Sequence, residues 1–199
     1  MTVLAATAWR TNAEMIVAVH ELGYLRDDDI VLDPTYGYGS FWKLWRPMLV
    51  TQHDLKLDGV NLCRLPHADG RFDAVVFDPP YKLNGRPTPE VDERYGVDVR
   101  ATRAERHQLI LDGIDECVRV LAPKGYLLLK CMDQVNGGKV RWQTREFADY
   151  AEQKHGMRLV DMLLMLGGRP QPAGRRQVHA RRNYSTLLVL QAAPHSGER

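Results

Sequence analysis

A short run that ends at Tyr81 combines the groups needed to hold a planar amine. The apolar residues 74–77 predict a buried strand of a parallel sheet, and polar or rigid residues follow at once. Open α/β sheets bind their ligands beyond the carboxyl ends of such strands. Asp78 offers a carboxylate, while Pro79 and Pro80 make a stiff turn without N–H groups and leave carbonyl oxygens to accept hydrogen bonds. Such a turn could hold a planar amino group edge-on while the ring of Tyr81 stacks on the attached base. The alternative is a proline turn that only ends a strand.

A second strand end enters a loop that contains two glycines. Residues 30–32 form a short apolar run that ends in Asp33, and Gly37 and Gly39 follow. Glycine allows a tight turn and a close approach of the backbone to a ligand. No third glycine has the dinucleotide-binding spacing, which disfavours a nicotinamide enzyme. Residues 41–45 then predict the start of a helix that Pro47 ends.

These two motifs carry a resemblance. Asp78-Pro79-Pro80-Tyr81 resembles the signature of S-adenosylmethionine-dependent amino-methyltransferases, which methylate exocyclic amines of adenine or, in relatives with variant motifs, of cytosine or guanine. The 33–39 loop resembles the first motif of the same enzymes. The resemblance covers about residues 10–190. It implies a Rossmann-like α/β fold with a mostly parallel sheet of seven strands, or one strand fewer, an antiparallel final strand and helices on both faces. It also implies one domain over residues 1–199, with an ordered core at about 10–190.

The resemblance implies S-adenosyl-L-methionine as the cofactor and no metal. Asp33 would face the cationic end of the cofactor or orient the loop. Asp54, after a predicted strand at 49–52, would accept hydrogen bonds from the ribose hydroxyls, with Asp58 as the alternative. Asn61, in a segment 60–62 that takes the place of the third strand, would face the adenine. The expected cofactor-binding residues are Asp33, Thr35, Tyr36, Gly37, Gly39, Asp54, Asn61 and Asp78.

The same resemblance makes Asp78, Pro79, Pro80 and Tyr81 the expected catalytic residues. An exocyclic amine is a poor nucleophile because its lone pair is delocalised into the ring. Hydrogen bonds from its N–H groups to Asp78 and the Pro79 carbonyl would localise that lone pair for attack on the sulfonium methyl. Positioning and electrostatics would supply most of the rate enhancement. In duplex DNA the base would first have to leave the stack and would then stack on Tyr81.

Periodicity predicts the remaining elements. Helices are expected over 13–22, 109–121 and 146–155, and strands over 126–131, 159–166 and 186–190. The last two strands would form the antiparallel closing hairpin. Thr11 or Asn12 is expected to cap the first helix.

Three loops would face the substrate, at about 82–104, 132–143 and 167–184. The last is rich in arginine and contains no acid, which favours a phosphate-rich partner over a merely solvated loop. Trp142 lies beside basic residues, and stacking on a base and packing under the next helix are equally compatible with its sequence. The expected substrate-binding residues are Tyr81, Lys82, Trp142, Arg169, Arg175, Arg176, Arg181 and Arg182.

The bulk composition fits these expectations. The chain has 199 residues, of which 26% are charged, and a net charge of +2. It shows no secretory signal and no run long enough to span a membrane, so we expect a cytoplasmic protein. The expected function is methylation of an exocyclic amine of a nucleic-acid base, and adenine in DNA is the favoured target. The first alternative is an enzyme that methylates adenine or guanine in tRNA or rRNA. The second is a non-catalytic nucleic-acid-binding subunit with the same fold. Because no separate recognition domain fits in this length, the three loops, a partner chain or a homodimer would supply target specificity.

Overall fold

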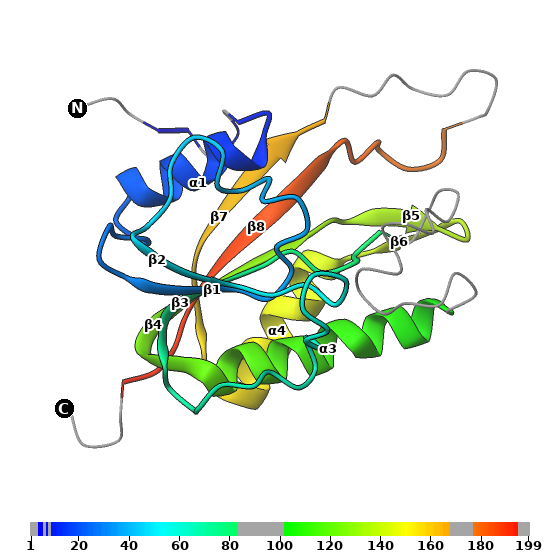
Figure 1. Ribbon diagram of the computed structural model, residues 1–199. Coiled ribbons are helices and arrows are strands. Elements are labelled where there is room, and N and C mark those ends of the chain that lie inside the picture. Colours follow the sequence, from blue (N-terminus) through cyan, green and yellow to red (C-terminus); the bar gives the residue numbers. More distant parts are fainter. Residues whose placement is uncertain (1–3, 6, 8, 83–101, 168–176, 195–199) are drawn as a thin grey trace.

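A computed structural model describes residues 4–5, 7, 9–82, 102–167 and 177–194. Figure 1 shows the helices and strands along the described chain. They are, in order, α1 (Asn12–Glu21), β1 (Ile30–Asp33), β2 (Leu49–Gln52), β3 (Phe72–Phe77), α3 (Arg103–Val120), β4 (Leu121–Cys131), β5 (Gln134–Asn136), β6 (Lys139–Arg141), α4 (Gln143–His155), β7 (Arg158–Leu166) and β8 (Tyr184–Gln191). None of the helices in these described ranges is long and apolar enough to cross a membrane.

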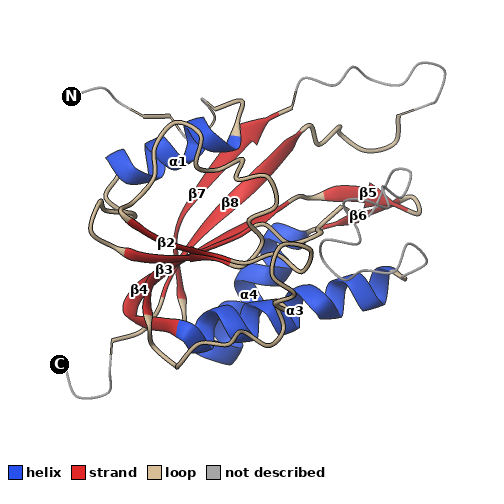
Figure 2. Cartoon of the chain, in the orientation of Figure 1, coloured by secondary structure: helices blue, strands red, loops and turns tan. Residues whose placement is uncertain are grey.

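The described strands form one six-stranded sheet and a separate two-stranded hairpin (Figure 2). The order in the large sheet is β2-β1-β3-β4-β8-β7. The first four strands are parallel, whereas β8 pairs antiparallel with both β4 and β7. The mostly parallel α/β sheet with an antiparallel final strand is therefore confirmed, in the version with one strand fewer than seven.

The central strands β1, β3, β4 and β8 are mainly buried on both faces, because their side chains alternate between two hydrophobic clusters. Val75 and Phe77 of β3 join a cluster with α3 and α4, and Ala74 and Val76 join a cluster with α1. Figure 1 shows α1 on one side of the sheet and α3 and α4 on the other. Helices on both faces are thus confirmed, and the flanking layers hold the strand ends in fixed positions.

Several elements match the sequence closely. Strand β2 has the predicted bounds, and turns, bends and irregular residues connect it to β3. Helix α1 begins at Asn12 because the Thr11 side chain accepts a hydrogen bond from the Glu14 N–H and the Glu14 side chain accepts from the Thr11 N–H. This reciprocal arrangement is a capping box. The strand predicted at 126–131 is the carboxyl-terminal part of β4, which lies between β3 and β8.

The predicted third strand at residues 60–62 is wrong. The Asn61 side-chain oxygen accepts a hydrogen bond from the Cys63 N–H at 2.9 Å, and the Asn61 carbonyl accepts from the Arg64 N–H at 2.9 Å. A side chain that satisfies the backbone locally favours a turn over a strand ladder. Asp78 consequently follows the third strand along the chain rather than the fourth.

The helix predicted from residues 41–45 is also absent. The indole of Trp42 donates to Asp33 at 2.8 Å, and the indole of Trp45 donates to Asp27 at 3.1 Å. These two contacts hold the segment in turns and bends. Tertiary hydrogen bonds thus override a weak local helical preference.

The segment predicted as a loop at 132–143 contains the β5–β6 hairpin. Gly137 and Gly138 connect the two strands, with φ angles of 57° and 74°. Two consecutive positive φ angles match the turn that best suits a two-residue hairpin, and glycine adopts them without strain. The hairpin projects from the carboxyl end of β4 (Figure 2).

Candidate active site

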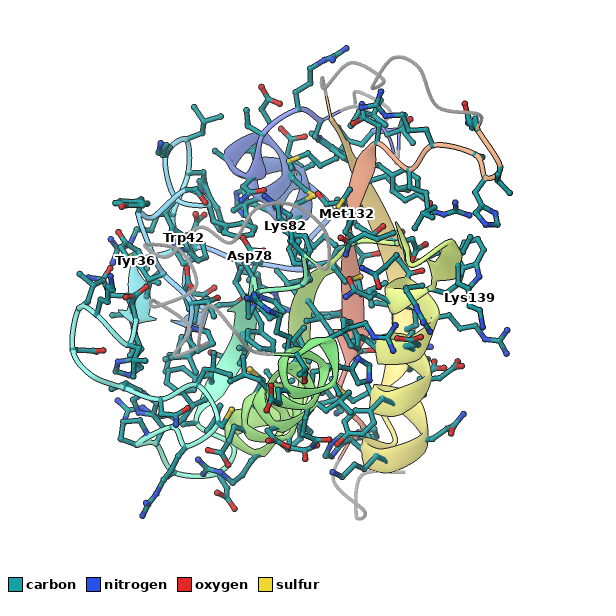
Figure 3. All side chains as sticks on the ribbon, turned by 90° about the vertical axis from the view of Figure 1, so that its right-hand side faces the viewer. Tyr36, Trp42, Asp78, Lys82, Met132 and Lys139 are labelled. Atoms are coloured by element: carbon teal, nitrogen blue, oxygen red, sulfur yellow. The ribbon has the colours of Figure 1, made fainter. Side chains whose placement is uncertain are left out.

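The carboxyl ends of the parallel strands bring most of the predicted site residues to one edge of the sheet. Asp33 ends β1, Asp54 follows β2, Asp78 follows β3, and Lys130 lies at the end of β4. This edge is where open α/β sheets bind ligands. Figure 3 looks onto it, with Asp78 near Trp42 and Lys82 in the centre and Lys139 of the hairpin farther away.

Asp33 is hydrogen-bonded to the 33–39 loop, which favours the predicted role of orienting this loop over a contact with the cofactor; the role stays a prediction. Its side chain is buried and accepts hydrogen bonds from the Thr35 N–H at 3.0 Å and from the Trp42 indole at 2.8 Å. Burial raises the pKa of Asp33 to about 7, and the nearby charge of Asp78 acts in the same direction. The two hydrogen bonds favour the ionised form but do not offset the lost hydration.

Glycine is required at two positions of this loop. Gly37 and Gly39 have φ angles of 57° and 63°, which other residues rarely adopt. A Cβ atom on Gly39 would lie 2.7 Å from the hydroxyl oxygen of Tyr36, a separation that real side chains do not tolerate. The Tyr36 ring therefore lies directly against the loop backbone.

Thr35 links the 33–39 loop to the turn formed by Asp78–Tyr81. The Asp78 N–H donates to the Thr35 hydroxyl oxygen at 2.9 Å. About one fifth of the Asp78 side chain is exposed, and its Oδ2 lies 4.0 Å from Lys130 Nζ. Burial raises the pKa of Asp78, whereas the charges of Lys130 and Lys82 oppose that rise. The carboxylate is accessible at the edge, but it is partly desolvated.

The rest of this turn is held by its own backbone and by two glutamines. The Tyr81 N–H donates to the Pro79 carbonyl at 2.7 Å, so one lone pair of that oxygen is used within the turn. This corrects the expectation that the turn would leave its carbonyls without an internal partner. The Tyr81 carbonyl accepts from Gln134 Nε2 at 2.8 Å and from Gln143 Nε2 at 2.9 Å.

The ring of Tyr81 packs against the cluster on the α3 side and is half-buried. Burial raises the pKa of its hydroxyl well above the usual value. The Pro80 ring, next in the same turn, is buried. Any stacking on a base would therefore use the remaining exposed part of the Tyr81 ring.

The acids after β2 differ in how they are engaged. Asp54 is buried beside the 33–39 loop, where its Oδ1 accepts from the Lys56 N–H at 2.9 Å. Asp58 Oδ2 lies 2.5 Å from His53 Nδ1, and His53 Nε2 lies 2.7 Å from His67 Nε2. Because the Tyr36 N–H donates to the His53 carbonyl, the chain just before Asp54 adjoins the loop directly. This geometry favours Asp54 over Asp58 for the ribose, and that role stays a prediction.

Asn61 is exposed and belongs to the turn described above, so its side-chain oxygen is already engaged with Cys63. Its amide nitrogen is the group left to face an adenine. The contact with the cofactor stays a prediction, and the strand that was expected to support it is absent.

The structure places Trp142 on the surface at the start of α4, where 48% of the residue is exposed. This excludes the alternative in which its ring packs in the core under the helix. The guanidinium of Arg182 lies 4.5 Å from the centre of the indole, a cation–π stack. His179 Nε2 lies 2.9 Å from the Gly138 carbonyl, which joins the segment before β8 to the β5–β6 hairpin.

Lys82 is exposed at the end of the Asp78–Tyr81 turn, and Arg181 is exposed beside Arg182. Arg169, Arg175 and Arg176 lie outside the described residues, as does most of the predicted loop at 82–104. In the described part of the chain, no three His, Cys, Asp or Glu side chains are grouped to hold a metal ion.

Four residues of this edge were not expected from the sequence: Asn12, Lys130, Gln134 and Gln143. Lys130 Nζ donates to Asn12 Oδ1, although the two residues are 118 positions apart. A lysine within an otherwise apolar strand was the signal that could have identified Lys130, because such a side chain must be buried with a partner. No comparable signal marks the glutamines, since their role depends on the hairpin.

Comparisons with known proteins support the fold. No family model matches the sequence, and no curated protein matches it. Among solved structures, a methyltransferase from Bacillus halodurans described as putative superposes with a TM-score of 0.54 at 13% identity, over 90% of this chain and 99% of that one. The N-methyltransferase NodS from Bradyrhizobium japonicum, in complex with S-adenosyl-L-homocysteine, superposes with a TM-score of 0.55 at 14% identity, over 90% of this chain and 86% of that one.

A SAM-dependent methyltransferase from Aquifex aeolicus gives a TM-score of 0.50 at 14% identity, over 92% of this chain and 90% of that one. The chain therefore has the Rossmann-like fold of S-adenosylmethionine-dependent methyltransferases. At this level of identity the likeness concerns the fold, and function has to be argued from the site.

Proposed function

We propose that this chain is an S-adenosylmethionine-dependent methyltransferase that acts on an exocyclic amine of a nucleic-acid base. The favoured target is adenine in DNA. One observation carries the proposal. The Asp78–Tyr81 turn is joined to the 33–39 loop by the hydrogen bond between the Asp78 N–H and the Thr35 hydroxyl. The residues that would hold the amine and the loop that would hold the cofactor therefore form one unit.

The residues at this edge fit the cofactor. Gly37 and Gly39 give the loop a backbone that approaches a ligand without side chains in the way. Asp54 supplies a carboxylate beside that loop at the end of β2, suited to a pair of ribose hydroxyls. When bound, S-adenosylmethionine supplies an electrophilic methyl group on a positively charged sulfur, which departs as a neutral thioether.

The chain's own residues would prepare the amine. The Asp78 carboxylate and the second lone pair of the Pro79 carbonyl each accept one N–H of the exocyclic amine. These hydrogen bonds draw the nitrogen from planar toward tetrahedral geometry, so its lone pair is localised and aligned with the methyl group. With the cofactor bound, transfer would form the N–C bond as the C–S bond breaks, and the amine would then release one proton. Asp78, the carboxylate in contact with the amine, is positioned to accept it.

A nucleic-acid target is supported by the surface beside this turn. The exposed Trp142 ring with its Arg182 stack offers a flat surface for a base and a positive charge for a phosphate. Lys139 and Arg181 are exposed in the adjoining hairpin and segment. A small amine substrate would need neither feature.

Asp78→Ala is expected to retain cofactor binding and to lose methyl transfer by at least about 10²-fold, because the group that localises the amine lone pair is removed. Labelled methyl transfer is measured on DNA, tRNA and rRNA, and cofactor affinity by calorimetry. Asp28→Ala, an exposed acid before β1, is the matched control and should behave like the wild type. An active Asp78→Ala variant would contradict the assigned role.

The substrate arms of the same assay separate the alternatives. Transfer to tRNA or rRNA without transfer to DNA would favour an RNA enzyme, and mass spectrometry of nucleosides from an expressing host would identify the modified base. A wild-type chain that binds nucleic acid but no cofactor would support the non-catalytic subunit instead.

A further inference from the structure

Lys130 is a buried cation in a strand that is otherwise apolar near its end. Its side chain is only 4% exposed, and the neighbouring Leu129 and Cys131 are fully buried. Burial lowers the pKa of a lysine because the ammonium loses its hydration, and this holds for Lys130. A cation in such a place has to be stabilised by specific partners.

Three partners surround the ammonium. Lys130 Nζ donates to Asn12 Oδ1 at the start of α1 and lies 5.5 Å from the ring centre of Phe41. The Asn12 amide donates in turn to the Ser40 hydroxyl at 3.2 Å. The third partner is the Asp78 carboxylate, 4.0 Å away. The ammonium thus lies where α1, the segment after the 33–39 loop and the Asp78–Tyr81 turn converge.

We propose that Lys130 is a positioning residue for the Asp78 carboxylate, which it keeps ionised and ready to accept the N–H of the substrate amine. The proposal rests on the proposed function and deepens it. At 4.0 Å the two charges attract each other strongly, but the separation is too long for a direct hydrogen bond. The carboxylate oxygens consequently keep their hydrogen-bonding capacity for the substrate.

The other groups near Asp78 show why this cation is needed. Asp33, at the end of β1, is a buried carboxyl group whose own pKa is raised by the charge of Asp78, so it offers Asp78 no compensating positive charge. Tyr81 and Lys82 belong to the same turn, and Lys82 is exposed, so its charge is screened by solvent. Among the described residues that influence Asp78, Lys130 is the cation that is both buried and close. Without it, the carboxyl group would more readily keep a proton, which would make it a weaker acceptor and prevent it from taking the proton of the amine.

The first test is the pH dependence of transfer. Lys130→Met keeps the length of the side chain but removes its charge, so the acid limb of the kcat profile should move upward by about 1–3 pH units. Lys130→Arg should restore most of the wild-type profile. Lys43→Met, at an exposed lysine after the 33–39 loop, is the matched control and should leave the limb in place. A uniform loss of rate at every pH would show a merely structural role and overturn the proposal.

The second test does not depend on activity. A double-mutant cycle of Lys130→Met and Asp78→Asn, followed by urea unfolding, should show that the second substitution costs less stability in the presence of the first. Additive effects would overturn the pairing. If the two residues are coupled but the wild-type chain transfers no methyl group, the proposed function would be refuted. The pairing of Lys130 with Asp78 would still stand.

A folding defect in the single variant is also informative. If Lys130→Met fails to fold, the double variant should fold, because it leaves no buried charge without a counter-charge. Failure of both variants would mean that Lys130 acts through packing alone, and the proposal would be wrong.

Discussion

Asp33 shows how one buried carboxyl group can link the fold to pH. Its ordinary pKa of 3.8 rises to about 7 in the folded chain because burial disfavours the charge. Between these two values the folded chain therefore holds a proton that the unfolded chain has released. The free energy of unfolding should then decrease as the pH rises through this window and become constant above it.

The prediction at Asp33 concerns that slope. From about pH 4 to 7, the group should lower the free energy of unfolding by up to about 1.4 kcal/mol per pH unit. Asp33→Asn keeps an acceptor for Trp42 but cannot titrate, so its unfolding free energy should change less over the same range. Urea unfolding at half-unit intervals would measure the difference between the two chains. Parallel curves would mean that Asp33 is already ionised at low pH in the folded chain.

Among the elements, α4 and the β5–β6 hairpin have a role that their positions along the chain do not suggest. The hairpin carries Gln134, and the first residue of α4 is Gln143. Both are buried, and both donate to the Tyr81 carbonyl. Gln143 also accepts from the Met132 N–H at 3.2 Å, which connects the end of β4 to the start of α4. Two separate elements therefore hold the end of the Asp78–Tyr81 turn.

Gln143→Leu should release one side of this turn. The loss of buried hydrogen bonds is expected to lower the free energy of unfolding by about 1–3 kcal/mol. Methyl transfer should decrease while cofactor affinity is retained, because the described hydrogen bonds of the Gln143 side chain go to Met132, Gln134 and Tyr81 and not to the 33–39 loop. Gln153→Leu, at an exposed position of the same helix, is the matched control for thermal unfolding and for the transfer assay. Equal behaviour of the two variants would remove the proposed role of α4.

At the level of the whole molecule, the positive charge is spread unevenly. The net charge is only +2, yet Lys139, Arg141, Arg181 and Arg182 lie in the hairpin and in the segment before β8. These segments adjoin each other through the contact of His179 with Gly138 and the stack of Arg182 on Trp142. An exposed aromatic ring within such a basic region is suited to single-stranded or unpaired bases.

Trp142→Ala should weaken the binding of single-stranded oligonucleotides by about 1–3 kcal/mol, because the stacking surface is lost.

Arg182→Ala should reduce the slope of log K against log salt by about 0.7 if it contacts a phosphate of a single strand. Fluorescence anisotropy at several salt concentrations measures both effects. Arg145→Ala, in an exposed ion pair of α4, is the control for the loss of one positive charge. Unchanged affinity in the Trp142 variant would place nucleic-acid binding elsewhere.

Local features of the chain were readable from residue order alone. The capping box of α1, strand β2, the glycine loop and the buried strand before Asp78 each depend on residues a few positions apart. Such patterns depend on the preferences of a short segment. Because the strands that they predict belong to a mostly parallel sheet, the residues after these strands are expected at one edge. The glycines and carboxylates of the candidate site could therefore be named before their positions were known.

The contacts that connect these groups depend on the folded chain. Gln143 lies 62 positions from the Tyr81 carbonyl that it binds, and Lys130 lies 118 positions from Asn12. Trp42 and Asn61 depart from their predicted elements because hydrogen bonds of their side chains outweigh weak local preferences. For the distant pairs, only packing of the helices and the hairpin against the sheet brings the partners within hydrogen-bonding distance. Burial then makes these hydrogen bonds necessary, because an unsatisfied buried polar group is costly.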